Sequence, residues 1–579
     1  MINRPFSSFT YLNVTQFLGA LNDNVYKLLI VFFLIQLQGI ENSHTILSLT
    51  GGIFVLPFLL FSTSCGTLAD RCSKRNIIVL TKILEFATMS IGAVAFRYES
   101  VAGSYFVLFM MATQSAIFGP SKYGIIPELV SSEKIPKANG LMTSFTFLAI
   151  ILGTFLASFI LDVTDKDFIV ASLFSVVVSL VGVVTSFYIE YTPPSGSIKK
   201  LNPDILEEIR NTLRIAKGET SLRAAIFGSA FFLFVAAYVQ LNIIPFAVES
   251  LHLTDVQGGY LFLLTALGIG MGSIIAGKIS GKIVELGLVP LAGIGLSGML
   301  FLLDLSSSNF LFCIPIVVIL GILGGMFEIP LDSYIQVASP SQYRGQIVAA
   351  TNFFSFFGVL VASGLLFLTN EVFHLKADKG FVVIGTLACL VSLIFGYLFF
   401  DYTTRFIAMV LSKLHFKTKL SGVNHLPDSP AIFVCTHTAW NDTLLILGAQ
   451  RRRVRFFIEK EYQHQNIWLY RLYRMLRIVR IPSIEPLENN YVCLATIKAT
   501  LNRGISVCIF TSNEDVIQEI ETLKNSYHFQ EIMEETNDPI IPIWIEKGEK
   551  EREPAFFTRL LKKFRVPATI AFGQTPLET

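Results

Sequence analysis

A histidine and an aspartate five positions apart occur in the segment Thr436-His437-Thr438-Ala439-Trp440-Asn441-Asp442. His437 follows a short apolar run, so we expect it just past a strand, with Asp442 about one turn into the next helix. The Asp442 carboxylate would then hold the imidazole in one tautomer, and the free ring nitrogen would accept a proton from a hydroxyl group. The spacing favours base-assisted acyl transfer without a protein nucleophile. A structural histidine is the alternative, because this spacing is common by chance.

A second group of candidates consists of charged side chains within long apolar runs, where charge is costly and usually functional. They form three pairs on single expected helices: Asp23 with Lys27, Lys82 with Glu85, and Glu328 with Asp332. The first two pairs have opposite charges and could form ion pairs. The third has like charges and requires a cation or a protonated member. Four amides could add hydrogen bonds: Asn22, Asn24, Gln114 and Asn352.

We expect these groups to line a cavity that binds a zwitterionic headgroup. Carboxylates would face its ammonium and a lysine would face its phosphate. Structural ion pairs between helices are the alternative for each pair.

The composition of the chain changes near residue 402. Of all 579 residues, 52% are hydrophobic and 15% are charged, whereas soluble proteins have about 25% charged residues. Residues 1–402 contain 46 charged residues, and the 177 residues of 403–579 contain 42. This division predicts an all-α membrane domain over 1–402 and a soluble domain after it, and it excludes a disordered chain.

Twelve apolar runs in the first part reach the roughly 20 residues that a spanning helix needs. They lie near 11–38, 46–68, 77–97, 101–120, 141–161, 168–190, 222–248, 257–277, 287–305, 310–338, 346–369 and 380–402. The longest polar break, 191–221, divides them six plus six, as in transporters built from two repeats. An amphipathic stretch in this break, Asp204–Lys217, is expected to lie along the cytoplasmic face.

The loops predict the orientation of these helices. Fifteen Lys and Arg residues lie in the loops on one side and four in the loops on the other, and cytoplasmic loops carry the excess of positive charge. Both termini and the soluble domain are therefore expected in the cytoplasm. Residues 403–419 combine apolar and spaced basic residues, which predicts an interfacial linker helix before the domain at 420–579.

The turn after the second run carries residues suited to a gate. It reads Gly66-Thr67-Leu68-Ala69-Asp70-Arg71-Cys72-Ser73-Lys74-Arg75. Gly66 would allow close helix packing, Asp70 would face a helix N-terminus, and Arg71 and Arg75 would pair across the gate.

This turn resembles the signature of the major facilitator superfamily. Three further segments, Gln16–Asn24, Gln114–Gly124 and Ala138–Gly140, are similar to the lysophospholipid-transporter branch of that superfamily. The resemblance covers about residues 1–400. It implies the twelve-helix major facilitator fold and lysophospholipid transport.

The second part alternates short apolar runs with helical patterns, which predicts an α/β domain. Four runs are expected to be buried strands: Ala431–Cys435, Val454–Ile458, Ser506–Phe510 and Ile540–Ile545. With the His437 motif, Leu420–Pro427 and Ala571–Leu577 resemble the PlsC-like glycerolipid acyltransferase family. The resemblance implies that His437 is the base, that Asp442 orients it, and that the acyl donor is acyl carrier protein or acyl-CoA.

Two blocks depart from the acyltransferase pattern, and in the family both help to hold the phosphate of the acyl acceptor. The family block F-P-E-G-T is replaced by Phe510-Thr511-Ser512-Asn513-Glu514, and G-x-x-P-I-x-R falls out of register on Arg477–Ser483. Arg477 and Arg480 are candidate replacements, because guanidinium groups bind phosphate in a bidentate manner. A basic run, Arg451–Arg455, is either a solvated face or a contact with anionic lipid.

The composition predicts an integral membrane protein, and the two resemblances imply that it lies in a bacterial inner membrane, moves lysophospholipid to the cytoplasmic leaflet and re-acylates it there. Its partners would be membrane lipids and acyl carrier protein or a separate acyl-activating enzyme. We expect no bound cofactor, no metal and no nucleic acid. The seven scattered cysteines are expected to be buried apolar residues rather than zinc ligands or disulfides. The alternatives are transport alone, with the second domain a degenerate lipid-binding or regulatory module, and a generic solute exporter.

Overall fold

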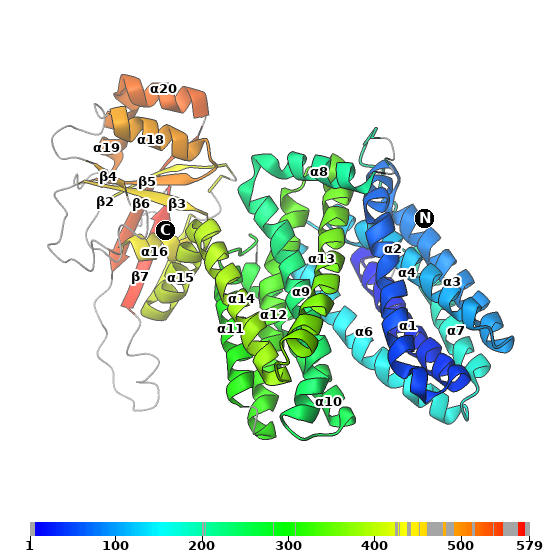
Figure 1. Ribbon diagram of the computed structural model, residues 1–579. Coiled ribbons are helices and arrows are strands. Elements are labelled where there is room, and N and C mark those ends of the chain that lie inside the picture. Colours follow the sequence, from blue (N-terminus) through cyan, green and yellow to red (C-terminus); the bar gives the residue numbers. More distant parts are fainter. Residues whose placement is uncertain are drawn as a thin grey trace. The chain divides into compact units, whose positions relative to one another are not determined.

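The chain folds into two compact units, Met1–Phe399 and Phe400–Thr579 (Figure 1). The computed structural model describes residues 6–573 except 200–201, 203, 282, 307–308, 423–425, 428, 437–441, 451, 460–478, 482–490, 512–515, 537 and 548–565. The division between the units lies three residues before the change in composition at residue 402.

Among the described residues, twelve helices are long and apolar enough to cross a membrane. The first six are α1 (Ser8–Gln38), α2 (Ser43–Arg71), α3 (Lys74–Arg97), α4 (Val101–Gly124), α6 (Ile135–Val163) and α7 (Phe168–Phe187). The second six are α9 (Thr220–Glu249), α10 (Asp255–Ser280), α11 (Leu288–Leu305), α12 (Phe310–Ala338), α13 (Arg344–Phe367) and α14 (Ala377–Leu398). The predicted twelve spans are confirmed, although the last ends four residues earlier than expected.

The polar break between the halves contains the short helix α8 (Ile205–Ile215). The Asp204 side chain accepts a hydrogen bond from the backbone N–H of Glu207 at 3.0 Å, which caps the helix and fixes its start. Figure 1 shows α8 lying across the ends of α2 and α13, and it contacts both helices. The amphipathic stretch predicted here therefore forms a helix that touches both halves.

Two helix pairs bring the halves into close contact: α2 with α13, and α6 with α10. A Cβ atom on Gly66 would lie 2.5 Å from Cβ of Ala349, and one on Gly140 would lie 2.4 Å from the carbonyl oxygen of Ser273. Any side chain at either position would separate the backbones. The close packing predicted for Gly66 is therefore confirmed.

The second unit is built on a seven-stranded sheet with the order β1-β7-β6-β2-β5-β3-β4. The strands are β1 (Phe416–Ser421), β2 (Ile432–Thr436), β3 (Val454–Glu459), β4 (Val479–Ile481), β5 (Ser506–Thr511), β6 (Ile540–Lys547) and β7 (Val566–Phe572). The four predicted strands correspond to β2, β3, β5 and β6. These strands and β4 are mutually parallel, whereas β7 is antiparallel to β6.

Alternating side chains of β2 supply the two cores of this unit. Phe433 and Cys435 pack toward α15 (Phe400–His415) and α16 (Asp442–Ala449). Ile432 and Val434 pack toward the other face, which is covered by α18 (Tyr491–Leu501), α19 (Val516–Asn525) and α20 (Tyr527–Thr536) (Figure 1). Because both faces of the sheet are covered, the central strands are continuously apolar.

The linker helix expected over 403–419 is shorter than predicted. Helix α15 ends at His415, and the following residues form β1, which pairs in parallel with β7. Gly422 then turns the chain with φ 72°, and a Cβ there would lie 2.0 Å from the carbonyl oxygen of Phe572. The spaced lysines of β1 resemble an amphipathic helix in sequence, but pairing with β7 decides the structure.

Candidate functional site

Asp70 connects the last turn of α2 to the first turn of α13. Its Oδ1 accepts from the backbone N–H of Gly345 at 2.7 Å, and its Oδ2 accepts from the backbone N–H and the side-chain amide of Gln346 at 3.0 and 3.1 Å. A carboxylate at a helix N-terminus satisfies unpaired N–H groups and the positive end of the helix dipole. The expected position of Asp70 is confirmed, and we call this contact the Asp70 latch.

The hydrogen bonds described for Arg75 with other helices lie within its own half. Arg75 donates to the carbonyl oxygens of Phe187 and Ile189 at 3.0 and 3.3 Å, so it caps the end of α7 in its own half. Arg71 is exposed. A further contact between the halves, not predicted from the sequence, joins Asn139 of α6 to Ser333 and Gln336 of α12 by hydrogen bonds of 3.0–3.2 Å.

Lys82 and Glu85 form the ion pair that their spacing predicts. Lys82 Nζ lies 2.5 Å from Glu85 Oε2, and both side chains are buried within the bundle. Asn22 of α1 donates to Glu85 Oε1 at 3.2 Å. The lysine also packs against Gly19 of α1, where a Cβ would lie 2.2 Å from Nζ. Helices α1 and α3 are therefore joined by a buried polar cluster.

Asp23 and Lys27 have separate partners, so the pairing expected from their spacing is wrong among the described contacts. Asp23 accepts from the hydroxyl of Ser115 at 2.8 Å and from the amide of Gln114 at 3.5 Å, both on α4. Lys27 instead lies over the ring of Phe54, 4.8 Å from its centroid. The i,i+4 spacing places both residues on one side of α1, but neighbouring helices offer each a better partner.

Glu328 and Asp332 share one donor. The hydroxyl of Ser229 on α9 lies 2.6 Å from Glu328 Oε1 and 3.3 Å from Asp332 Oδ1. Lys122 is one of the fifteen basic residues expected in loops, yet it lies in the last turn of α4 and interacts electrostatically with the like-charged Lys82 and with Asp332 and Asp23. Its ammonium also lies 4.5 Å from the ring centroid of Tyr123. Because α4 continues to Gly124, Lys122 lies within the helix and near the intramembrane carboxylates. Its presence in the predicted Gln114–Gly124 segment is the feature of the sequence that could have identified it.

Of the two predicted catalytic residues, Asp442 is described by the structure, and it lies six residues after the end of β2 in the sequence. His437 directly follows the last residue of that strand, and Asp442 is buried as the first residue of α16. Thr436 of β2 pairs with Thr511 of β5, so the segments after both strands begin at the same edge of the sheet. That edge is where open parallel sheets carry their ligand sites. His437, Arg477 and Glu514 lie outside the described residues.

Arg480 lies on strand β4, where it is the partner of Ile458 in β3. Strand β4 is three strands away from β2 in the sheet, which corresponds to a lateral distance of about 14 Å. The proposed contact of Arg480 with an acceptor phosphate stays a prediction. Cys435 of β2 and Cys508 of β5 are both buried in the core of the second unit, and burial raises the pKa of the Cys508 thiol.

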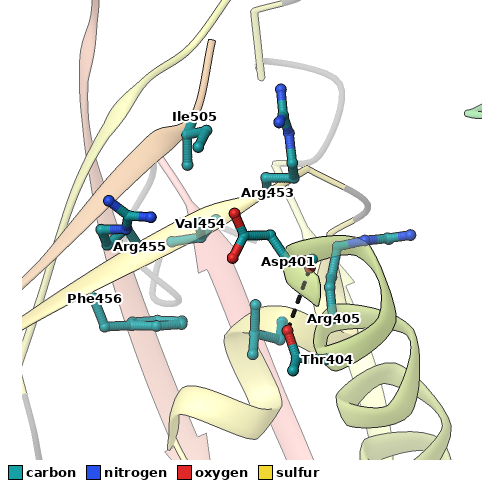
Figure 2. A pocket seen from close by; sticks show the side chains of 9 residues that line it. Asp401, Thr404, Arg405, Arg453, Val454, Arg455, Phe456 and Ile505 are labelled. Atoms are coloured by element: carbon teal, nitrogen blue, oxygen red, sulfur yellow. Dashed lines mark hydrogen bonds between the residues drawn. The ribbon is translucent and has the colours of Figure 1, made fainter. Parts of the chain in front are cut away.

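A small pocket lies at the opposite, amino edge of the sheet, where β3 and β5 begin. Figure 2 shows the Asp401 carboxylate pointing into it, with Arg453 and Arg455 among its walls. Arg405 of α15 also lines the pocket and is 2% exposed. Arg453 lies over the ring of Tyr402, 5.0 Å from its centroid. Arg453 and Arg455 of the basic run predicted at Arg451–Arg455 therefore lie beside α15, at the edge of the sheet opposite the carboxyl end of β2.

Comparison with known proteins identifies the membrane unit. Residues 12–363 match the family model of the Major Facilitator Superfamily. The chain belongs to the major facilitator superfamily. Residues 417–546 match the model named Acyltransferase, so the second unit is an acyltransferase domain of this superfamily member.

Curated relatives and solved structures agree with this assignment. The membrane unit is 27% identical over 364 residues to the lysophospholipid transporter LplT of Klebsiella pneumoniae, covering 62% of this chain and 87% of the relative. The LplT of an Enterobacter strain is 26% identical over 374 residues, which cover 64% of this chain and 89% of the relative.

Two solved transporters share the fold. The human organic anion transporter MFSD10 matches with a TM-score of 0.56 and 14% identity, and the match covers 67% of this chain and 99% of MFSD10. A bacterial homologue of the iron transporter ferroportin, in an outward-facing state, matches with a TM-score of 0.55 and 13% identity, and the match covers 69% of this chain and 100% of the homologue.

Proposed function

We propose that this protein moves lysophospholipid across the membrane with its first unit and re-esterifies it with its second. The observation that supports this most is the fusion itself: a unit similar to lysophospholipid transporters precedes an acyltransferase domain on one chain. The product of transport, a lipid with a free hydroxyl, is the class of acceptor that such a domain uses.

The charges of the membrane unit suit a zwitterionic headgroup. Lys122 can attract the phosphate, because in the described part of the chain its ammonium forms no direct ion pair with Asp23 or Asp332, whose carboxylates attract it from a longer distance. Glu328 and Asp332 can receive the ammonium of the headgroup. Lys82 is less suited to substrate binding, since Glu85 already neutralises it within 2.5 Å. We therefore assign Asp23, Lys122, Glu328 and Asp332 to the headgroup and Lys82 to the scaffold.

The distribution of loop charge supports an orientation with both termini and the acyltransferase domain in the cytoplasm of a bacterial inner membrane. The Asp70 latch then lies at the cytoplasmic end. Because the latch and the Asn139 contacts join the halves there, the described conformation corresponds to a transporter closed on its cytoplasmic side. Lysophospholipid would enter from the outer leaflet and leave after these contacts break.

In the acyltransferase step, His437 accepts the proton of the lipid hydroxyl as that oxygen attacks the acyl thioester, and the thiol of the donor leaves. Asp442 orients the imidazole from the start of α16. The donor would be acyl carrier protein or acyl-CoA, loaded by a separate enzyme, and Arg477 and Arg480 are the candidate contacts for the acceptor phosphate.

The interfacial role of α15 is supported by its exposed apolar side. Four residues on one side of this helix are 40–59% exposed in the structure: Ile407, Val410, Leu411 and Leu414. Their spacing is that of a single helix face. Leu398, the last residue of the final span, is only two residues before α15. We propose that this face lies in the lipid interface and keeps the active site near its membrane-bound acceptor.

Transport alone is the second candidate, and the replaced phosphate block at Phe510–Glu514 favours it. Transport itself is tested with labelled lysophosphatidylethanolamine added to spheroplasts that lack their own transporter. We expect lipid to reach the inner leaflet with the wild-type chain and with His437→Ala. Lipid that stays outside in both would contradict the transport proposal and favour a generic exporter.

A further inference from the structure

The segment that connects the two halves contributes side chains to the Asp70 latch. Lys199, in this segment, donates to Glu208 Oε1 of α8 at 2.5 Å and to Gln346 Oε1 at 2.7 Å. Gln346 is the residue whose side-chain amide bonds Asp70. The side-chain amide of Gln346 therefore has two partners: its oxygen accepts from Lys199, and its nitrogen donates to Asp70.

Glu208 connects the same lysine to the first half. Its Oε1 also accepts from the hydroxyl of Thr67 on α2 at 3.3 Å, and the residue is 2% exposed. The Lys199–Glu208 pair thus bridges Thr67 on α2 and Gln346 on α13. These are the two helices that the latch joins, and α8 lies across both.

The start of the connecting segment is also anchored. Lys74, at the beginning of α3, is fully buried and donates to Ser195 Oγ at 2.6 Å and to Glu128 Oε1 at 2.6 Å. Lys199 follows Ser195 by four residues, so its backbone stays within about 14 Å of this anchor in the first half while the contact persists. When α2 and α13 separate, Lys199 cannot follow both Glu208 and Gln346.

We propose that Lys199 and Glu208 form a clamp that stabilises the closed latch, so that the connecting segment takes part in gating in addition to joining the halves. Both are positioning residues: Lys199 acts on Asp70 through Gln346, and Glu208 ties Lys199 to Thr67 of α2, three residues before Asp70. Opening the gate requires one of the contacts of Lys199 to break, and Glu208 is a buried carboxylate that loses its neutralising partner if Lys199 leaves. This proposal rests on the proposed transport function in one respect: the Asp70 latch must open and close during transport.

The clamp can be tested by measuring how often the latch opens. Ala349 is buried in the α2–α13 contact beside Gly66, so Ala349→Cys reports opening by its rate of reaction with a maleimide. The full chain carries this reporter with Cys65 and Cys72 replaced by serine. A second reporter, Ala69→Cys, lies beside Gly345 and provides an independent readout.

We expect Glu208→Gln and Lys199→Met each to raise the labelling rate by about fivefold or more, the lower end of coupling between linked sites. Lys199→Arg, which keeps the donor, should stay near the starting rate. The matched control is Glu207→Gln, because this neighbouring carboxylate is exposed and accepts from the side chain of Asn202, within the connecting segment itself.

Labelling of Glu208→Gln and Lys199→Met at the starting rate, with Asp70→Asn labelled faster, would overturn the clamp. An equal rise in Glu207→Gln would also overturn it, since the effect would then follow net charge. The assay contains no lysophospholipid, so its result is independent of whether that lipid is the substrate.

Discussion

Asp70 and Gln346 are joined twice, through the backbone N–H of Gln346 at 3.0 Å and through its side-chain amide at 3.1 Å. The pair links residues 276 positions apart, one in each half of the transporter. Because a carboxylate at a helix N-terminus accepts stronger hydrogen bonds than a neutral group, its charge contributes directly to closing this end.

Replacing Asp70 by asparagine keeps the shape of the side chain and removes this charge. We expect Asp70→Asn to lower lysophospholipid transport about tenfold or more, since a hydrogen bond to a charged group is worth about 1.5–3 kcal/mol. Acylation of lipid supplied to the acyltransferase side should be unchanged. Measuring both activities in the same membranes separates a gating defect from misfolding, which would remove both.

A methyl group at Gly19 would disturb the buried Lys82–Glu85 pair. The new Cβ would lie 2.2 Å from Lys82 Nζ, and overpacking of this kind costs about 1–3 kcal/mol. We expect Gly19→Ala to lower the thermal unfolding midpoint of the full chain in detergent. Gly298→Ala is the control, because a Cβ there meets nothing within 4 Å. Equal midpoints for the two variants would mean that Lys82 moves away at no cost.

The positive charge of Lys122 should matter for substrates that carry a phosphate. We expect Lys122→Met to lower lysophospholipid uptake about tenfold, which corresponds to about 1.4 kcal/mol of binding. Lys122→Arg should retain most of the activity. A monoacyl lipid without a phosphate serves as the control substrate, and its uptake should be the same in the wild type and in Lys122→Met. Equal loss for both lipids would assign Lys122 to the scaffold instead.

The exposed apolar side of α15 predicts a specific defect in acylation at the membrane. Leu411, 48% exposed, lies within this side. We expect Leu411→Glu to reduce acylation of lysophospholipid in bilayers severalfold, because a carboxylate is expelled from the interface. Leu411→Ala should have a smaller effect. Acylation of the same lipid dispersed in detergent should be equal in all three chains if the domain remains folded.

Much of the fold follows from simple patterns in the sequence. The twelve spans and the strands β2, β3, β5 and β6 are strongly apolar over the length that each element requires, so composition alone locates them. The contacts of Gly66, Asp70 and the Lys82–Glu85 pair were also predictable, because close spacing or a familiar turn limits what these residues can do.

Other features depend on contacts that are distant in the sequence. Strand β1 has lysines at alternate positions, Lys417 and Lys419, and only pairing with β7 makes this segment a strand. Asp23 and Lys27 could have paired, but Ser115 and the Phe54 ring compete for them. Lys122 was expected in a loop because the predicted span ends at residue 120, four residues before the end of α4. Lys199 and Glu208 have no distinguishing pattern in the sequence, and their contacts become visible only when α8 lies against α2 and α13.

The most direct test of the central claim is the transfer of labelled acyl chains to lysophospholipid by membranes that contain the full chain. The wild-type chain and His437→Ala are compared, with Asp442→Asn as the variant that removes the orienting carboxylate. We predict incorporation with the wild type, a strong reduction with Asp442→Asn and none above background with His437→Ala, while transport continues in all three. Equal incorporation in the wild type and His437→Ala would contradict the account and leave a transporter with a non-catalytic second domain.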